Sequence, residues 1–201
     1  MKLFIDSATN YLYLAVIDGD KAYSFSREGR NDHSETLTNY LETFLDNNSI
    51  KVEDITEVYV GRGPGSYTGL RIAGTVGKVY AFIKELPLYS FSSLDLIFAK
   101  VADNDGLYKA MIKAKKNHSY LKAYKVENGK ITVQQEDMFL CDDELSKFDD
   151  FEKINVDETF FNDEGKLALN IIKYNLYKEE NTFTYVPNYL RSELSWSDLW
   201  N

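Results

Sequence analysis

A glycine-rich turn is the first stretch of the sequence whose residue types and spacing could do chemistry. The segment GRGPGSYTG at 61–69 follows an apolar run and precedes a run with helical periodicity. Glycines at such a junction permit positive φ angles, and the first turn of the helix offers free N–H groups and a partial positive charge. A strand-to-helix turn of this kind can therefore bind an anion such as a phosphate.

This turn fits none of the standard phosphate or nucleophile motifs. It lacks the Gly-Lys-Ser/Thr of a P-loop, and Ser66 stands where a dinucleotide fingerprint starting at Gly61 needs its third glycine. Ser66 is also not framed by the glycines of a nucleophile elbow. Two interpretations stay open: a vestigial anion-binding turn, or a tight turn in which Ser66 or Thr68 caps the helix. The candidate anion-binding residues are Gly63, Gly65, Ser66, Tyr67 and Thr68.

Few other side chains have the types or spacing of a catalytic or metal site. Asp6 ends the first apolar run, where a carboxylate can either hold a phosphate-bound metal or cap a turn. His33 is a candidate partner contact or a solvated residue, and His118 lies in a predicted turn. With two histidines and one cysteine in the chain, and no nucleophile beside a base, we predict no metal site and no catalytic residue.

Six lysines between residues 109 and 125 form a basic island that is interleaved with tyrosines. Two interpretations stay open, a weak contact with tRNA or an acidic partner, and the solvated face of a sheet. The lysines are Lys109, Lys113, Lys115, Lys116, Lys122 and Lys125.

The composition is that of a globular protein with an acidic surface. The chain has 201 residues, of which 44% are hydrophobic and 27% are charged, and its formal net charge is −9. This charge disfavours strong nucleic-acid binding by the whole surface, because such binding needs Lys and Arg to replace phosphate counterions. The single cysteine fits a reducing compartment, and no apolar run approaches the ~20 residues of a membrane span. We therefore expect a cytoplasmic protein.

Periodicity in the first hundred residues predicts an α/β arrangement with a mixed sheet. Short apolar runs separated by turn-forming residues predict three strands, joined in part by a hairpin at 18–20. Apolar residues at three- and four-residue spacing predict the helices. The expected strands cover 3–5, 11–17, 22–25, 55–61 and 86–91, and the expected helices cover 33–47, 68–84 and 92–102.

The polar run at 103–106 is the predicted boundary between domains of residues 1–103 and 104–201. The second domain is expected to contain a three-stranded meander with a turn at Asn128-Gly129, and a tail at 187–201 whose aromatic residues pack back on the body. After the meander we expect a short helix at 142–148, a short strand at 151–157 and a helix at 163–179.

The helix at 68–84 carries two non-polar faces. One face is a ridge of small residues, namely Gly69, Ala73, Gly77 and Ala81, and the other is a bulky stripe of Ile72, Val76, Val79, Tyr80 and Ile83. Each glycine costs roughly 1 kcal/mol of helix propensity relative to Ala, so close packing is expected to compensate for it. A helix of this kind needs two neighbours. One is the chain's own sheet, and the second is either another helix of the chain or a partner subunit.

Five segments together resemble the TsaB family, formerly YeaZ, of tRNA threonylcarbamoyladenosine biosynthesis proteins. The resemblance covers the first hundred residues and the tail, and its most specific part is the glycine turn with its helix. The segments are FIDSATN, HSETL, GRGPGSYTGLRIA, LPLYSFSSLD and PNYLRSELSW.

The resemblance implies the actin-like, sugar-kinase-like ATPase (ASKHA) fold, with a smaller and shortened second α/β domain. It also implies a paralogue of the catalytic subunit TsaD. TsaD-like proteins carry two metal-binding histidines after a Pro-Leu pair, and the corresponding positions here are Ser93 and Ile97. A hydroxyl and an aliphatic side chain do not replace imidazole ligands. The expected protein is therefore a non-catalytic subunit without a cofactor of its own, and a nucleotide is expected only at the heteromeric complex.

For partners, the resemblance implies that the helices 33–47 and 68–84 pair with TsaD, or with a second copy of the chain when it is alone. TsaE belongs to the larger complex, which makes N6-threonylcarbamoyladenosine at tRNA position 37, and tRNA is contacted only indirectly. The predicted partner-binding residues are His33, Leu37, Tyr40, Leu41, Phe44, Gly69, Ala73, Val76, Gly77, Tyr80 and Ala81. The alternative function is a stand-alone nucleotide-binding phosphotransferase or hydrolase that uses Asp6 and the helix N-terminus at 66–68.

Overall fold

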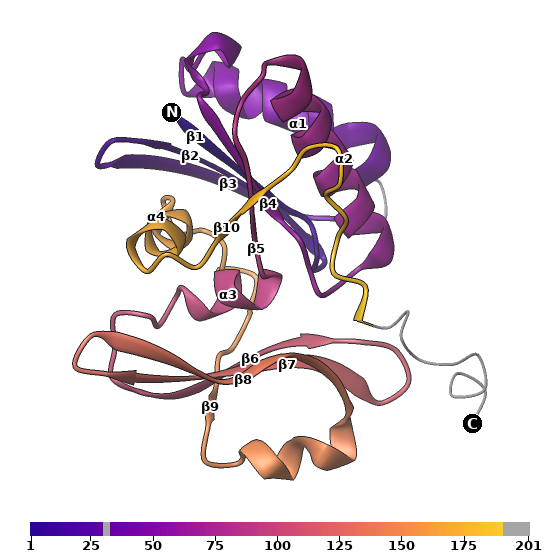
Figure 1. The fold of residues 1–201 in the computed structure, drawn as a ribbon, viewed down its shortest axis with the longest axis vertical. Coiled ribbons are helices and arrows are strands. Elements are labelled where there is room, and N and C mark those ends of the chain that lie inside the picture. Colours follow the sequence, from indigo (N-terminus) through magenta and orange to yellow (C-terminus); the bar gives the residue numbers. More distant parts are fainter. Residues whose placement is uncertain (30–32, 191–201) are drawn as a thin grey trace.

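Two β-sheets lie one above the other, with a short helix between them (Figure 1). This computed structural model describes residues 1–29 and 33–190, and the described side chains do not include those of 33–35. None of the helices in these ranges is long and apolar enough to cross a membrane.

The first sheet has six strands and mixed pairing, as the sequence predicted. Three parallel strands form its centre, and antiparallel strands flank them on both sides. In spatial order the strands are β10 (Lys178–Glu180), β5 (Leu88–Phe91), β4 (Glu57–Gly61), β1 (Lys2–Asp6), β2 (Tyr11–Asp18) and β3 (Lys21–Glu28).

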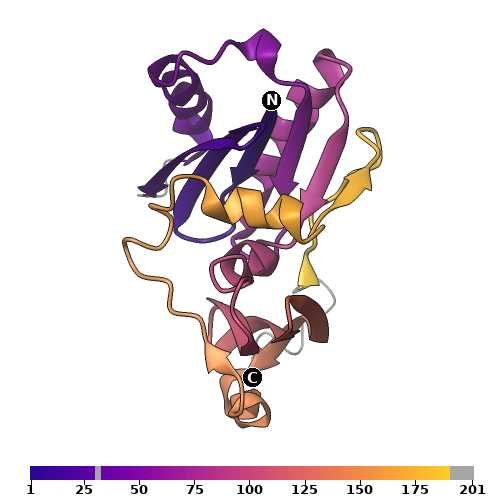
Figure 2. The same cartoon turned by 90° about the vertical axis from the view of Figure 1, so that its left-hand side faces the viewer.

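Helices cover both faces of this sheet (Figures 1 and 2). The helices α1 (His33–Asn47) and α2 (Tyr67–Ile83) lie on one face, and the 3-10 helix η1 (Val52–Asp54) precedes β4. The other face is covered by α4 (Lys166–Lys173), which also contacts α3 (Ser93–Phe98). The arrangement gives the sheet a separate apolar core on each side.

The second sheet is the predicted meander, and part of the short strand expected at 151–157 joins it as a parallel fourth strand. Its antiparallel strands are joined by tight turns, one of them at Asn128-Gly129, where both residues have positive φ. Its order is β8 (Lys130–Cys141), β7 (His118–Glu127), β6 (Gly106–Lys113) and β9 (Glu152–Lys153). The expected short helix at 142–148 is the 3-10 helix η2 (Asp142–Phe148).

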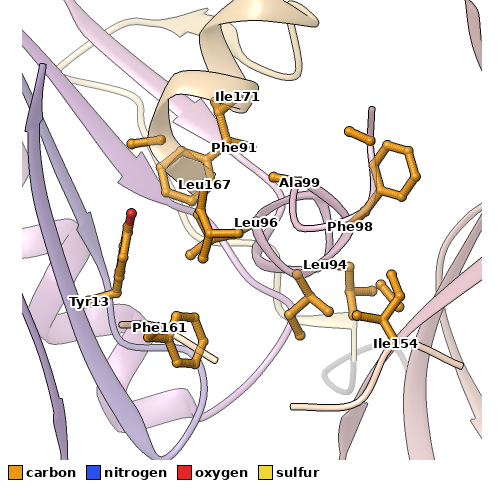
Figure 3. Close-up of a cluster of buried hydrophobic side chains, with 14 of the residues drawn as sticks. Tyr13, Phe91, Leu94, Leu96, Phe98, Ala99, Ile154, Phe161, Leu167 and Ile171 are labelled. Carbon is orange, nitrogen blue, oxygen red and sulfur yellow. The ribbon is translucent and has the colours of Figure 1, made fainter. Parts of the chain in front are cut away.

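One apolar core joins the two sheets through α3 (Figure 3). Phe98 of α3 stacks on Tyr124 of the second sheet with ring centroids 3.8 Å apart. On its other side α3 meets side chains of the first sheet and of α4, among them Phe91 and Leu167. Residues 106–153 thus build the second sheet, whereas the chain after them returns to the first, and the division at residue 103 stays a prediction.

Two predicted helices are shorter than expected. The helix expected at 163–179 ends at Lys173, because Asn175 adopts a positive φ of 53°, and 178–180 then pair with β5 as an antiparallel strand. The helix expected at 92–102 ends at Phe98, and the side-chain amide of Asn170 donates to the carbonyl of Ala99 at 2.8 Å. A contact from α4 therefore caps the end of α3.

Asp163 anchors α4 to the first sheet. Its carboxylate accepts hydrogen bonds from the Ser24 hydroxyl at 2.9 Å and the Tyr13 hydroxyl at 3.2 Å. The same carboxylate accepts from the backbone N–H of Leu167, so it also caps the first turn of α4.

Replacing Asp163 by alanine should therefore lower the free energy of unfolding by about 2 kcal/mol, since several charge-assisted hydrogen bonds are lost together. Urea denaturation of wild type and variant measures the change. The matched control is Glu158→Ala, which removes an exposed carboxylate from the same connection. Equal loss in both variants would contradict the anchoring role.

Candidate functional site

The glycine turn lines a cleft of about 1030 Å³ between the two sheets. Gly65, Ser66, Tyr67 and Thr68 contribute to one wall, and residues 111–115 contribute to the wall made by the second sheet. Gly63 does not line this cleft, because Leu70 and the backbone of Asn188 lie against it. Its φ is +97°. Four of the five predicted anion-binding residues thus lie together, and anion binding itself stays a prediction.

The capping interpretation of the turn is confirmed. The Ser66 hydroxyl accepts from the backbone N–H of Gly69 at 3.2 Å, and the Ser66 N–H donates to the carbonyl of Ala8 at 2.7 Å. A side chain at Gly65 would place its Cβ 2.3 Å from that same carbonyl oxygen. Glycine is needed here because the connection between β1 and β2 approaches the turn closely.

Asp6 is enclosed below the turn and does not line the cleft. Its carboxylate accepts from the Ser93 hydroxyl at 2.6 Å and from the Ala8 N–H at 3.0 Å, and only 1% of the residue is exposed. Burial raises the pKa of this carboxyl above its usual range, against the lowering effect of these hydrogen bonds. A Cβ at Gly61 would lie 1.7 Å from the carboxylate, so the backbone of β4 closes the site further. Asp6 thus acts as the turn cap that one interpretation predicted.

Ser93 and Ile97, which stand where TsaD-like proteins carry their metal-binding histidines, have other contacts in the structure. Ser93 uses its hydroxyl on Asp6, and the buried side chain of Ile97 lines the cleft. Among the described side chains, those of 1–29 and 36–190, no three His, Cys, Asp or Glu residues are grouped so that they could hold a metal ion.

The lysine island does not form one continuous basic surface. Lys109 donates to the carbonyl of Phe148, Lys113 pairs with Asp142, and Lys125 pairs with Glu127. Lys122 is only 7% exposed, so the solvated-face interpretation is wrong for this residue. Of the six lysines, Lys113 and Lys115 line the cleft.

Lys122 belongs to a buried polar network that the sequence reasoning missed. Its ammonium lies 3.0 Å from Asp95 of α3, whose carboxylate also accepts from the Tyr124 hydroxyl at 2.7 Å. The ammonium is also 4.0 Å from Asp137 of β8. No sequence signal could have found this network, because its members come from α3, β7 and β8.

Asp137 links three parts of the chain at the edge of this network. Its two carboxylate oxygens accept from the Ser92 hydroxyl at 2.8 Å and from the side-chain amide of Asn188 at 3.3 Å. Burial raises the pKa of Asp137 to about 6, although Lys122 opposes this shift. A group of this kind can change charge near neutral pH.

The small-residue ridge of α2 packs inside the chain. A Cβ at Gly77 would lie 2.2 Å from Cγ1 of Val60, and one at Gly69 would lie 1.8 Å from the carbonyl oxygen of Ser7. Ala73 and Ala81 are fully buried in the same core. The assignment of these four residues to a partner surface was therefore wrong, because the chain's own sheet is the neighbour that needs small residues.

Most of the predicted partner residues of α1 also face the chain's own core. Leu37, Leu41 and Phe44 are buried in the core beneath the helix, whereas Tyr40 is half-buried. His33 begins α1, but its side chain lies outside the described residues.

The bulky stripe of α2, and not the ridge, faces a groove. We define the α1–α2 groove as the hollow of about 680 Å³ that these two helices and 50–53 enclose. The half-buried Val76 and Tyr80, both predicted partner residues, line it together with Leu41. Its most exposed apolar residues are Ile83 and Val79, at 69% and 48% exposure. Both belong to the predicted bulky stripe, but neither is among the predicted partner-binding residues.

Exposed apolar surface continues from this groove across α2. Phe82 is 54% exposed, and its ring meets that of Phe183 edge-on with centroids 5.3 Å apart. Phe183 and Val186 are exposed as well, and Lys78 donates to the Phe183 carbonyl at 3.3 Å. Adjacent exposed apolar side chains of this size are typical of protein interaction sites.

Comparison with known proteins identifies relatives of this chain. The family model described as TsaD, tRNA N6-adenosine threonylcarbamoyltransferase, matches residues 27–191. The tRNA threonylcarbamoyladenosine biosynthesis protein TsaB of Bacillus subtilis is 27% identical over 143 residues, which span 70% of this chain and 62% of that protein. The uncharacterized protein MG208 of Mycoplasma genitalium is 27% identical over 200 residues, which span 96% of each chain.

A solved structure of YeaZ from Pseudomonas aeruginosa has the same fold. It superimposes with a TM-score of 0.75 at 19% sequence identity, over 94% of this chain and 99% of that one. The predicted actin-like α/β fold is thereby confirmed.

Because the ridge packs internally, Gly77→Leu should lower the free energy of unfolding by about 3 kcal/mol or prevent folding. Urea denaturation measures the effect, and Thr75→Leu on the exposed side of α2 is the control. A Gly77→Leu protein as stable as the wild type would contradict the packing described here.

The raised pKa of Asp137 predicts a pH effect with a definite sign. Between the ordinary pKa of 3.8 and the folded-state value of about 6, the folded protein binds the proton more tightly than the unfolded chain does. The contribution of Asp137 to stability therefore falls as the pH rises, by about 2 kcal/mol from pH 4.5 to 7.5. Asp137→Asn should remove this dependence, which urea midpoints across the pH range measure. Parallel pH profiles of wild type and variant would refute the assignment.

Proposed function

We propose that this chain is a non-catalytic subunit. It belongs to the family of TsaD, tRNA N6-adenosine threonylcarbamoyltransferase, and within it to the TsaB (YeaZ) proteins. Its role is in the biosynthesis of threonylcarbamoyladenosine in tRNA, for which its TsaB relatives are named. In this proposal it binds TsaD within a larger complex that includes TsaE, works in the cytoplasm, and contacts tRNA only indirectly.

The observation that carries the proposal is the exposed apolar surface of the α1–α2 groove. Val79 and Ile83 stand on a helix whose opposite face is fixed against the sheet, so they are presented on a rigid support. The Tyr80 hydroxyl donates to the Val52 carbonyl at 2.7 Å, which holds one wall of the groove in place. A rigid apolar groove between two helices suits an apolar helix of a partner protein.

The rim of the groove adds a charge requirement. The acidic side chains of Glu42, Asp46 and Glu53 line it, and one of its two lysines, Lys84, is paired with Glu53 at 3.7 Å. A partner with basic residues beside its apolar helix would complement this rim. A second copy of the chain brings the same acidic side chains, so we propose TsaD as the preferred partner.

The enclosed state of Asp6 supports the non-catalytic part of the proposal. A carboxylate that is buried against Ser93 and the backbone of Gly61 is not presented to a phosphate in the cleft. We propose that the isolated chain holds no cofactor, and that any nucleotide binds at the junction with TsaD. Calorimetry of the isolated chain with ATP and Mg²⁺ tests this point. Tight binding together with turnover would overturn it in favour of a stand-alone phosphotransferase or hydrolase.

The partner surface is tested by a double variant that carries both Val79→Glu and Ile83→Glu. Two charges in the centre of an apolar interface should weaken binding to the cognate TsaD by about 30-fold or more. Isothermal titration calorimetry measures the affinity, and size-exclusion chromatography of each protein alone and of the mixture separates homodimer from heterodimer.

The control for this experiment is Thr43→Glu, which adds a charge to an exposed position of α1 outside the groove. It should bind TsaD like the wild type and support tRNA modification in a reconstituted assay. Wild-type affinity in a folded Val79→Glu, Ile83→Glu protein would refute the proposed surface, and absence of binding by the wild type would refute the proposed function.

A further inference from the structure

The chain segment 183–189, which we call the strap, runs alongside α2 toward the second sheet (Figure 1). Some of its residues face the inside of the molecule and others face the outside. Tyr185 is only 5% exposed and packs over Gly74 of α2, where a Cβ would lie 3.1 Å from its ring. Phe183 and Val186 are exposed, at 73% and 61%. The strap thus holds α2 with one side and adds apolar surface beside the α1–α2 groove with the other.

The far end of the strap is fastened across the cleft. The backbone N–H of Asn188 donates to the Arg62 carbonyl at 2.7 Å, and its side-chain amide donates to Asp137 of β8 at 3.3 Å. The ring of Tyr189 lies 5.0 Å from that of Tyr67 in the first turn of α2. Asn188 and Tyr189 both line the cleft. One short segment therefore touches α2, the glycine turn and the second sheet.

Two of the contacts that hold the second sheet to the rest of the described chain differ in strength. Near α3 the attachment is the buried network of Asp95, Lys122 and Tyr124 with the apolar core around it. At the strap it is the bond between Asn188 and Asp137, which are both half-buried. A single partly solvated hydrogen bond breaks more readily than a buried network, so the strap contact is the one that can open without unfolding.

We propose that the strap couples the partner surface to the cleft. A partner that covers Phe82 and Phe183 holds the strap against α2, and the strap then holds β8 through Asn188 and Asp137. This inference rests on the proposed function, because that function supplies the partner. The coupling requires two states of the chain. In one state Asn188 donates to Asp137, and in the other this hydrogen bond is broken. Thermodynamic linkage requires that a partner which favours the closed contact binds less tightly when the contact is removed.

The first arm of the test uses the isolated chain. Hydrogen exchange is compared in the wild type, in Asn188→Ala, and in the control Gln135→Ala. Gln135 lies on β8, the strand of Asp137, and its side chain donates to the adjacent Glu136 carbonyl. Asn188→Ala should exchange faster in the strap and around Asp137 and equally fast in α1 and the centre of the first sheet. The control should match the wild type throughout.

The second arm measures affinity for the cognate TsaD. Asn188→Ala should bind at least about fivefold more weakly than the wild type, although Asn188 does not line the α1–α2 groove. Binding of TsaD to the wild type should in turn slow hydrogen exchange around Asp137. Gln135→Ala should show wild-type affinity.

The outcomes separate this inference from the proposed function. Faster exchange in Asn188→Ala with unchanged affinity for TsaD overturns the coupling and leaves the proposed function standing. Unchanged exchange in Asn188→Ala overturns the strap contact itself. If the wild type does not bind TsaD at all, the proposed function and the coupling fall together.

Discussion

The close approach of α2 to the first sheet is the constraint on which the other features depend. At Gly69 and Gly77 the helix backbone comes so near to Ser7 and Val60 that a single methyl group would collide. Glycine in a helix costs roughly 1 kcal/mol relative to alanine, and the tight contact with the sheet offsets that cost. Because one face of α2 is fixed in this way, its two flanks become available, one for the α1–α2 groove and one for the strap.

Sequence periodicity was sufficient for most elements of the fold. Two of the hairpins carry Gly or Asn-Gly at positions of positive φ, and both long helices have clear apolar spacing. The strand β10 could not be predicted, since its three residues are Lys-Glu-Glu and have no apolar alternation. It exists because the edge of β5 offers backbone partners, and Ser90 also donates to Glu180 at 2.6 Å.

The candidate site could be predicted from the sequence only in part, because its contacts depend on the tertiary structure. The sequence identified two apolar faces on α2, but both satisfy the same helical spacing, and residue size alone did not decide which one meets the sheet. The glycine ridge suits either a partner helix or a sheet. Its contact with Val60 is seen only in the folded structure. The link between Asp137 and Asn188 joins residues that are 51 positions apart, and local patterns carry no information about such pairs.

The strand β10 has a consequence for how the molecule associates with others. An open strand edge offers unpaired N–H and C=O groups on which another chain can add a strand. Here the chain covers the edge of β5 with its own later segment, and that segment is short and fully charged, so it is a poor template for a further strand. At this edge of the sheet, association is therefore directed away from backbone pairing and toward side-chain contacts.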